Sequence, residues 1–186
     1  MAERLSALAG HAEPRRFGAP DTVGVTLSEV PGLVLHQAAC WPDTMGAVAE
    51  QIAKASGADA APGPGRAVAG KNGTLLRIEP LKWWILDTPA PALASDEGAV
   101  LDLSHSRTRI RLSGPEAATL LNRHLPLDLR TGRFPPGSVG SSAVHHVGVT
   151  VWHSDLGYDL FLPRSFALSL WEGLVESAAQ FGAEIV

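Results

Sequence analysis

Paired cysteines, long apolar runs and an excess of basic residues are all missing from this sequence of 186 residues. The one cysteine is Cys40, so an internal disulfide is excluded. Lysine and arginine number 15 against 19 aspartates and glutamates, which argues against a nucleic-acid surface because such surfaces carry a basic excess. No run approaches the roughly 18 apolar residues of a membrane-spanning helix, and the first residues lack the apolar stretch of a secretory signal. These absences predict a cytoplasmic chain that binds neither membrane nor nucleic acid.

Motifs of nucleotide-binding and hydrolytic enzymes are missing too. There is no G-x-S-x-G, and no G-x-G-x-x-G leads into a helix. Residues 65–72 (GRAVAGKN) match the phosphate-binding loop G-x-x-x-x-G-K until the last position, where Asn72 replaces the Ser or Thr that binds magnesium. The dipeptide Asn72-Gly73 is typical of a turn into a strand. We therefore interpret the segment as a flexible loop without a phosphate site.

Histidines and the cysteine are the remaining candidates for metal binding or nucleophilic catalysis. His145 and His146 are adjacent on a predicted strand, so their side chains should point to opposite faces. His36 lies four residues from Cys40 on one strand, about 13 Å away, which is too far to activate the thiol. The seven histidines are His11, His36, His105, His124, His145, His146 and His153. Because none pairs with another at ligand spacing on a helix, we predict no catalytic, cofactor-binding or metal-binding residue, and a buried Cys40.

Two adjacent tryptophans, Trp83 and Trp84, lie on a predicted strand. One indole must face the core and the other must face outward, because side chains alternate along a strand. The outward indole either covers a helix of the same chain or lies in a subunit interface, where aromatic residues are enriched. The sequence leaves both alternatives open.

The first half of the chain predicts four strands around one helix. Residues 1–20 show no apolar period and are interpreted as a flexible N-terminal tail. The helix is predicted over residues 45–55, with Asp43 as its N-cap and Gly57 at its end. The strands are predicted at residues 23–27, 33–37, 75–78 and 83–86.

The second half predicts five strands and two helices. One helix, over residues 117–124, should open with a capping box from Ser113 to Glu116, and the other, over residues 166–181, should be capped by Ser165. The strands are predicted at residues 100–104, 108–112, 143–153, 158–162 and 183–186. From Thr108 onward the order is β-α-β-β-α-β, which is the ferredoxin-like arrangement.

These elements predict an α+β fold of two ferredoxin-like β-α-β units packed together. After the tail, residues 21–186 would form a single unit with pseudo-halves at about 21–98 and 99–186. The first half, β-β-α-β-β, would be a degenerate copy of the second.

Several segments carry a resemblance to a known family. The stretch from Asp102-Leu103-Ser104-His105 to Ala117 resembles the aminomethyltransferases of the glycine cleavage system, whose members share D-x-S-H, a strand, and G-x-x-A opening a helix. Within that superfamily the sequence resembles more closely the gamma subunits of heterotetrameric sarcosine oxidase. The segments that carry this closer resemblance are residues 127–129 (LDL), 134–137 (FPPG) and 161–170 (FLPRSFALSL).

The resemblance implies the folate-binding fold of the aminomethyltransferases and a non-catalytic structural role. In the enzymes, folate chemistry relies on an acidic residue in the third strand region, where this sequence has residues 145–149 (HHVGV) without a carboxylate. The resemblance implies that FAD, FMN, NAD, tetrahydrofolate and zinc are bound by partner subunits and none by this chain. The implied partners are the alpha, beta and delta subunits, chiefly the large alpha subunit.

Three hypotheses follow. The first is a structural gamma subunit of a complex that oxidatively demethylates sarcosine to glycine. The second is a stand-alone folate-binding, aminomethyltransferase-like protein that has lost its transferase chemistry. The third is an active aminomethyl-transferring enzyme, against which the missing carboxylate and the short chain argue.

Overall fold

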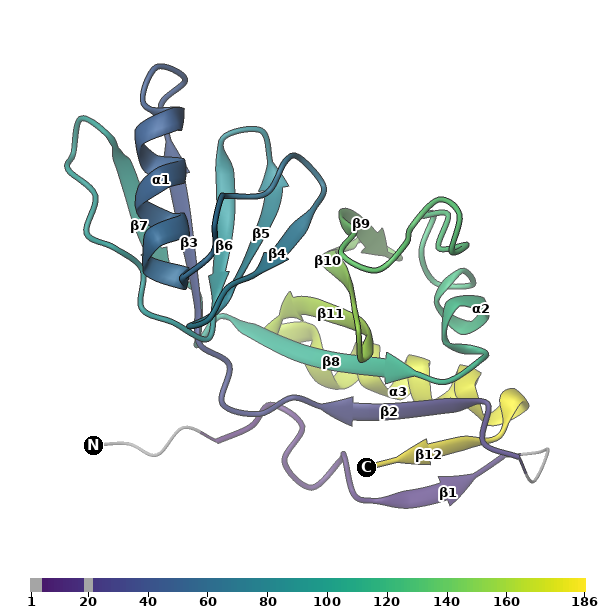
Figure 1. The fold of residues 1–186 in the computed structure, drawn as a ribbon. Helices are drawn as coiled ribbons and strands as arrows, with labels where there is room; N and C mark the ends of the chain where they lie inside the picture. The colour runs from purple at the N-terminus through teal and green to yellow at the C-terminus, as the bar shows by residue number, and fades with distance from the viewer. Residues whose placement is uncertain (1–4, 19–21) are drawn as a thin grey trace. The chain divides into compact units, whose positions relative to one another are not determined.

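The computed structural model describes residues 5–18 and 22–186, which form two α+β units (Figure 1). One unit comprises the described residues up to 31 together with 106–136 and 141–186, and the other comprises 32–105 and 137–140. We call them the seven-stranded and the five-stranded unit, after their sheets. Within the described ranges, no helix is long and apolar enough to cross a membrane.

The seven-stranded unit has the strand order β1-β12-β2-β8-β11-β10-β9. Its strands are β1 (Arg15–Phe17), β2 (Val25–Glu29), β8 (Arg107–Ser113), β9 (Val139–Val144), β10 (Val147–Ser154), β11 (Gly157–Pro163) and β12 (Ala183–Ile185). Its helices are α2 (Ala117–Leu121) and α3 (Ala167–Ala178), and 3-10 turns precede and follow α3. The chain order is β8-α2-β9-β10-β11-α3-β12. It is the predicted β-α-β-β-α-β arrangement with one difference: the strand predicted at residues 143–153 is divided into β9 and β10.

One strand interrupts this ferredoxin-like sheet. β2 pairs antiparallel with β8 and parallel with β12, and so separates two strands that would otherwise be neighbours. The strand predicted at residues 23–27 therefore belongs to the same sheet as the second half of the chain. The predicted pseudo-halves, 21–98 and 99–186, differ from the two units for this reason.

The helices of this unit bury one face of the sheet. The predicted apolar stripe of α3 is buried at Leu170, Leu174 and Ala178, as the helical period requires. It packs in one core with alternate residues of the central strands, such as Ile110 of β8 and Leu160 of β11. The predicted fold class, α+β, is confirmed in this unit.

The N-terminal segment contributes to the same unit over its described residues. β1 pairs with β12 from Arg15 to Phe17, and Leu8 is 1% exposed within the core. Residues 5–18 thus differ from the predicted loose tail, because a single strand edge on β12 can order a segment that has no apolar period of its own. Residues 1–4 and 19–20 of the predicted tail lie outside the described residues.

The five-stranded unit has the strand order β4-β5-β6-β3-β7. Its elements are β3 (Leu35–Cys40), α1 (Met45–Ser56), β4 (Ala67–Ala69), β5 (Thr74–Glu79), β6 (Lys82–Leu86) and β7 (Gly98–Asp102). The antiparallel order β7-β3-β6-β5 is again that of a ferredoxin-like sheet, with the segment 87–97 in place of the second helix. α1 covers one face, where Val48 and Ile52 pack on Ala38 and Trp83.

Helix ends were predicted with mixed success. Gly57 ends α1 in the left-handed conformation at φ 69°, as predicted. The three predicted N-caps are wrong, because the residues before α1, α2 and α3 make no side-chain cap bond. Backbone carbonyls just before β2 and β8 instead accept hydrogen bonds next to α2 and α3: Glu116 N–H donates to Gly24 O, and Arg164 N–H, in the 3-10 turn before α3, donates to Ser106 O. The three wrongly predicted caps are Asp43, Ser113 and Ser165.

Candidate interaction surface

The segment that resembles a phosphate loop is a structural β-hairpin. Ala67–Ala69 form β4, and Gly70 to Gly73 turn the chain into β5. Asn72 donates from its backbone N–H to Ser56 O and from its side-chain amide to Ala55 O at 3.3 Å, and Lys71 N–H donates to O of Gly57, the residue that ends α1. These donors cap a helix C-terminus, so they point toward carbonyl oxygens instead of toward a phosphate.

Cys40 is 7% exposed, and its Sγ lies 3.7 Å from the carbonyl oxygen of Leu81. Burial raises the pKa of the Cys40 thiol, with Arg77 acting weakly in the opposite direction. A protonated thiol is a poor nucleophile and a poor metal ligand. The prediction that Cys40 is buried is confirmed.

The two adjacent histidines were predicted on a strand, and this prediction is wrong. His145 and His146 form the two-residue turn between β9 and β10, with His145 at φ 53°. The turn carries the His145 ring to 6.5 Å from the His124 ring, edge to face, and His124 Nε2 lies 2.9 Å from Ser177 Oγ. Burial, followed by His145 and Arg123, lowers the pKa of His124.

Metal coordination needs more ligands than this pair supplies. Over residues 5–18 and 22–186, no group of three or more His, Cys, Asp or Glu side chains is placed to hold an ion. His153, the other histidine of this unit with a defined partner, directs Nδ1 at Phe134 O (2.7 Å) and stacks on Tyr158. These rings make packing contacts.

The D-x-S-H stretch makes a turn that closes the five-stranded unit. Asp102 Oδ1 accepts from Ser104 N–H at 2.8 Å, and the Ser104 hydroxyl bonds to both backbone groups of Leu35. Hydrogen bonding by Ser104 lowers the pKa of Asp102, and the nearby His36 and His105 act in the same direction. The polar groups of this motif therefore hold the end of β7 against β3.

A buried ion triad lies on the sheet face opposite α2 and α3, and sequence reasoning did not find it. Asp159 is fully buried and accepts from Arg109 Nε at 2.9 Å and from Arg111 Nε at 3.0 Å. Arg109 also lies 5.5 Å from the rings of Trp152 and Phe161. The carboxylate oxygens are occupied by charge-assisted hydrogen bonds from two guanidinium groups, so the triad is suited to structural roles.

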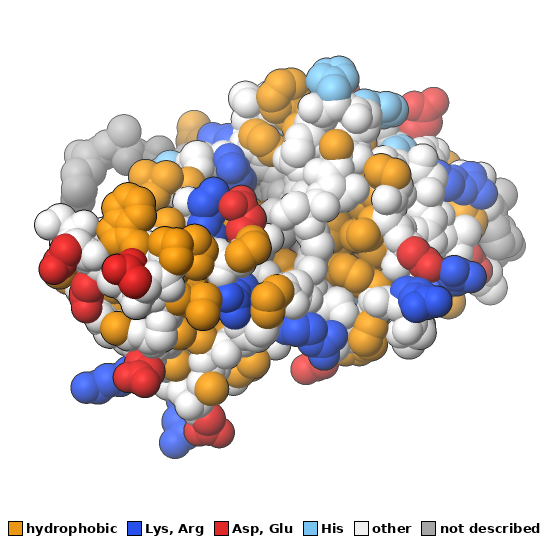
Figure 2. Space-filling view, turned by 90° about the horizontal axis from the view of Figure 1, so that it is seen from above, with side chains coloured by type: hydrophobic (Ala, Val, Ile, Leu, Met, Phe, Trp, Pro, Cys, Tyr) orange, Lys and Arg blue, Asp and Glu red, His pale blue; other side chains and the backbone are white. Residues whose placement is uncertain are grey.

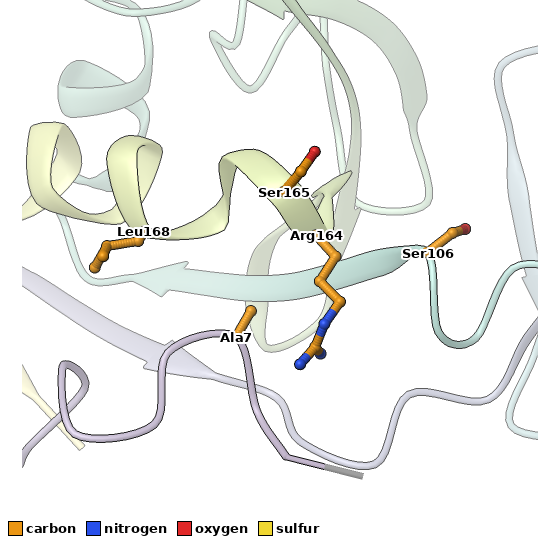
Figure 3. Close-up of a pocket in the computed structure, with 5 residues that line it drawn as sticks. All are labelled: Ala7, Ser106, Arg164, Ser165 and Leu168. Carbon is orange, nitrogen blue, oxygen red and sulfur yellow. The ribbon is translucent and has the colours of Figure 1, made fainter.

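A hollow of about 590 Å³ lies beside the start of α3 (Figure 3). It is lined by Ala7, Ser106, Arg164, Ser165 and Leu168. Figure 3 shows Arg164 extending toward the segment that carries Ala7, while Ser165 points to the other side of the helix. The Arg164 guanidinium donates to Leu5 O at 2.5 Å, so it ties the N-terminal segment to the helix.

Trp83 and Trp84 are both buried, at 1% and 4% exposure. Trp83 faces α1 with the Arg77 guanidinium 4.7 Å from its ring, and Trp84 Nε1 donates to Gln37 Oε1 at 3.2 Å on the opposite face. The alternation was predicted correctly, but neither indole is at the surface. The exposed indole of this unit is Trp41, at 55%.

Exposed apolar side chains of the five-stranded unit occur on β7 and beside it. Leu101 is 56% exposed and Val100 is 38% exposed, and Trp41 and Met45 lie where β3 leads into α1. Figure 2 shows hydrophobic side chains, interspersed with acidic and basic ones, over the part of the view in which this unit lies. Because β7 is also the last strand of its sheet, its outer edge and these side chains form the candidate interaction surface.

Comparison with known proteins confirms the resemblance. The chain is 32% identical over 100 residues to sarcosine oxidase subunit gamma of Corynebacterium sp. strain U-96 and 31% identical over 96 residues to that of strain P-1. These alignments cover 53% and 51% of this chain, and the chain spans about half the length of the curated relatives it matches, 49% and 47%. No family model matches the chain.

Solved structures extend the likeness of fold to nearly the whole chain. A chain of the heterotetrameric sarcosine oxidase of Corynebacterium sp. U-96, solved in complex with pyrrole 2-carboxylate, superposes with a TM-score of 0.79 over 96% of both chains at 24% identity. The glycine cleavage system aminomethyltransferase T of Bartonella henselae superposes with a TM-score of 0.60 over 86% of this chain and 48% of its own, at 17% identity. The predicted aminomethyltransferase-like fold is confirmed.

Proposed function

We propose that this chain is a non-catalytic gamma subunit of a heterotetrameric sarcosine oxidase, which oxidatively demethylates sarcosine to glycine. The observation that carries the proposal is the identity of 32% to a subunit of that name, together with a fold that covers 96% of a chain from such an enzyme. The same fold serves many activities, so fold alone would not suffice.

The non-catalytic part of the proposal rests on how the polar groups of the chain are used. The phosphate-loop-like turn caps α1, and the Cys40 thiol has a raised pKa. The Asp159 carboxylate is held between two arginines, and the Asp102 carboxylate is held in a turn. These four groups are thus committed to structural contacts, which supports a role in assembly.

Within the proposed complex, FAD, FMN, NAD, tetrahydrofolate and zinc belong to the alpha, beta and delta subunits. This chain packs chiefly against the large alpha subunit, in the cytoplasm. Its exposed apolar strand supports such packing, since subunit interfaces have apolar, aromatic-rich centres.

The test is co-expression of the chain with the alpha, beta and delta subunits of a heterotetrameric sarcosine oxidase. We expect the four chains to co-purify and oxygen uptake with sarcosine to depend on all of them. A three-subunit preparation without this chain that assembles fully and oxidises sarcosine at the same rate would refute the proposal.

The stand-alone folate-binding hypothesis keeps one supporting observation, the superposition on an aminomethyltransferase. The five tryptophans allow a direct measurement, because a bound pterin quenches indole fluorescence. The proposed role predicts no saturable quenching of the isolated chain by tetrahydrofolate at high-micromolar concentration, with N-acetyltryptophanamide as the control for inner-filter absorption. Saturable quenching would favour the folate-binding hypothesis.

A further inference from the structure

β7 presents one backbone edge that the sheet does not use. The strand is last in its sheet and pairs with β3 alone. At one end Leu103 N–H donates to Leu35 O, and at the other Trp41 N–H donates to Glu97 O. Because hydrogen-bonded pairs alternate along an antiparallel ladder, the N–H and C=O of Val100 point away from β3. Among the described residues, none bonds to these two groups.

Side chains on both faces of this edge are exposed. Val100 pairs with Ala38 and therefore lies on the α1 side, while Leu101 pairs with Gln37 and lies on the other side. They are 38% and 56% exposed, and the preceding Ala99 is exposed as well. An open edge with apolar side chains on both faces is a template for another strand, which monomeric proteins usually avoid. We therefore expect another strand to pair with this edge.

The charges around β7 indicate what covers it. Asp96 and Glu97 precede the strand and Asp102 ends it, and no Lys or Arg lies within residues 87–104. If two copies of β7 paired antiparallel about Val100, Asp102 of each would lie opposite Gly98 and next to Glu97 of the other. That pairing would bring the Asp102 end of each strand beside the Asp96–Glu97 end of the other, and the repulsion of the gathered negative charges disfavours a second copy of this chain. A basic segment would be favoured.

We propose that β7 binds an extended segment of a partner subunit by strand addition, and that this segment carries basic residues on either side of a short apolar stretch. Its backbone continues the sheet through Val100, and its apolar side chains cover Val100 and Leu101. Trp41, beside the Glu97 end, offers an exposed indole to a flanking Arg or Lys. The assignment of the partner to the oxidase complex rests on the proposed function. The open edge and exposed side chains of β7 are observed independently of that function.

The experiment uses the full complex with a tag on the alpha subunit and two substitutions at one position. Val100→Pro removes the outward N–H, whereas the ladder to β3 does not use that group. Val100→Thr keeps the N–H and the shape of the side chain. We expect the apparent Kd for incorporation to rise at least about tenfold for Val100→Pro and less than about threefold for Val100→Thr. Circular dichroism of each isolated variant checks folding.

A third variant tests the charge. Asp102→Asn keeps the side-chain oxygen that accepts from Ser104 N–H but removes the negative charge. We expect its affinity to fall at low ionic strength and to depend less on salt than that of the wild type. An unchanged salt dependence would refute the basic partner segment.

Hydrogen exchange of the wild-type chain decides the case if Val100→Pro does not fold. We expect the Val100 amide to exchange rapidly in the isolated chain and to become protected in the complex.

Two results would overturn strand addition and leave the proposed function standing. In one, the wild-type chain assembles while its Val100 amide stays unprotected. In the other, folded Val100→Pro assembles as the wild type does. A wild-type chain that does not assemble overturns the proposed function and its partner. Protection of Val100 in a dimer of the isolated chain overturns the inference in favour of a second copy.

Discussion

Removal of the buried negative charge at Asp159 is expected to destabilise the seven-stranded unit strongly. Asp159 is fully buried, and the side chains of Arg109 and Arg111 are 7% and 21% exposed. Asp159→Asn keeps the shape of the side chain but leaves two guanidinium groups facing a neutral amide. Breaking a buried ion pair by neutralising one partner typically costs about 3–5 kcal/mol, because the remaining charge is desolvated without compensation.

For a chain of this size, each kcal/mol shifts the melting temperature by about 2–4 °C, so we expect a fall of roughly 6–20 °C. The matched control is Asp128→Asn, which removes the same charge from the exposed pair with Arg130, whose side chains are 41% and 77% exposed. Exposed pairs contribute little because water screens them, so this control should melt like the wild type.

Urea unfolding followed by tryptophan fluorescence and by far-UV circular dichroism measures both variants. The double substitution Arg111→Met with Asp159→Asn should recover part of the loss, because it leaves one buried cation instead of two. If Asp159→Asn lowered stability no more than Asp128→Asn, the triad would not be the stabilising element inferred from its burial.

Three further perturbations test other parts of the structure. Gly70→Ala places a Cβ 2.2 Å from the carbonyl oxygen of Ser56 in α1, so it should lower the free energy of unfolding in urea by about 1–3 kcal/mol. Gly173→Ala in α3 has open space around the new Cβ and should raise that free energy by about 0.5–1 kcal/mol. Equal effects of the two substitutions would contradict the close approach at Gly70. Burial lowers the pKa of His124, so the folded state binds a proton at this ring less readily than the unfolded chain does. The free energy of unfolding should therefore decline as the pH falls below 6.5, and His124→Gln should reduce that decline. An NMR titration midpoint of His124 above 6.5 would contradict the lowered pKa. Burial raises the pKa of the Cys40 thiol. Ellman's reagent should therefore label this thiol at pH 8 far more slowly in the native chain than in the urea-unfolded chain. Equal labelling rates would contradict the burial of Cys40.

Local pattern was sufficient to predict most helices and strands of the second half of the chain, although not the turn at residues 145–146. The β-α-β-β-α-β order came from apolar alternation in the strands and from the helical stripe of α3, because each of these elements buries one face in one core. The turn between β10 and β11 was also predicted, where Ser154 Oγ donates to Gly157 O. These features depend on neighbours in sequence.

Features set by distant parts of the chain could not be predicted in this way. The apolar alternation of residues 23–27 predicts a strand but not that β2 pairs with β8, more than 75 residues later. The sequence of β7, Gly-Ala-Val-Leu-Asp, has the composition of a buried strand, yet the strand is exposed because it is last in its sheet. His145 turns the chain at φ 53° without the Gly or Asn that usually signals such a turn.

The D-x-S-H stretch shows why resemblance transferred the fold more securely than the activity. Its carboxylate and hydroxyl are consumed in bonds that close β7 against β3, so a protein can need these residues for folding whether or not it catalyses anything. A shared motif of this kind identifies a way of turning the chain, and many functions can be built on it. The distinguishing feature of this chain is therefore a surface: the strand that this turn completes is exposed on both faces and open at its edge. Assembly of the wild-type chain with the other subunits consequently discriminates between the proposed functions more directly than assays for catalysis by the isolated chain, and the Val100 variants then test whether this strand is the surface used.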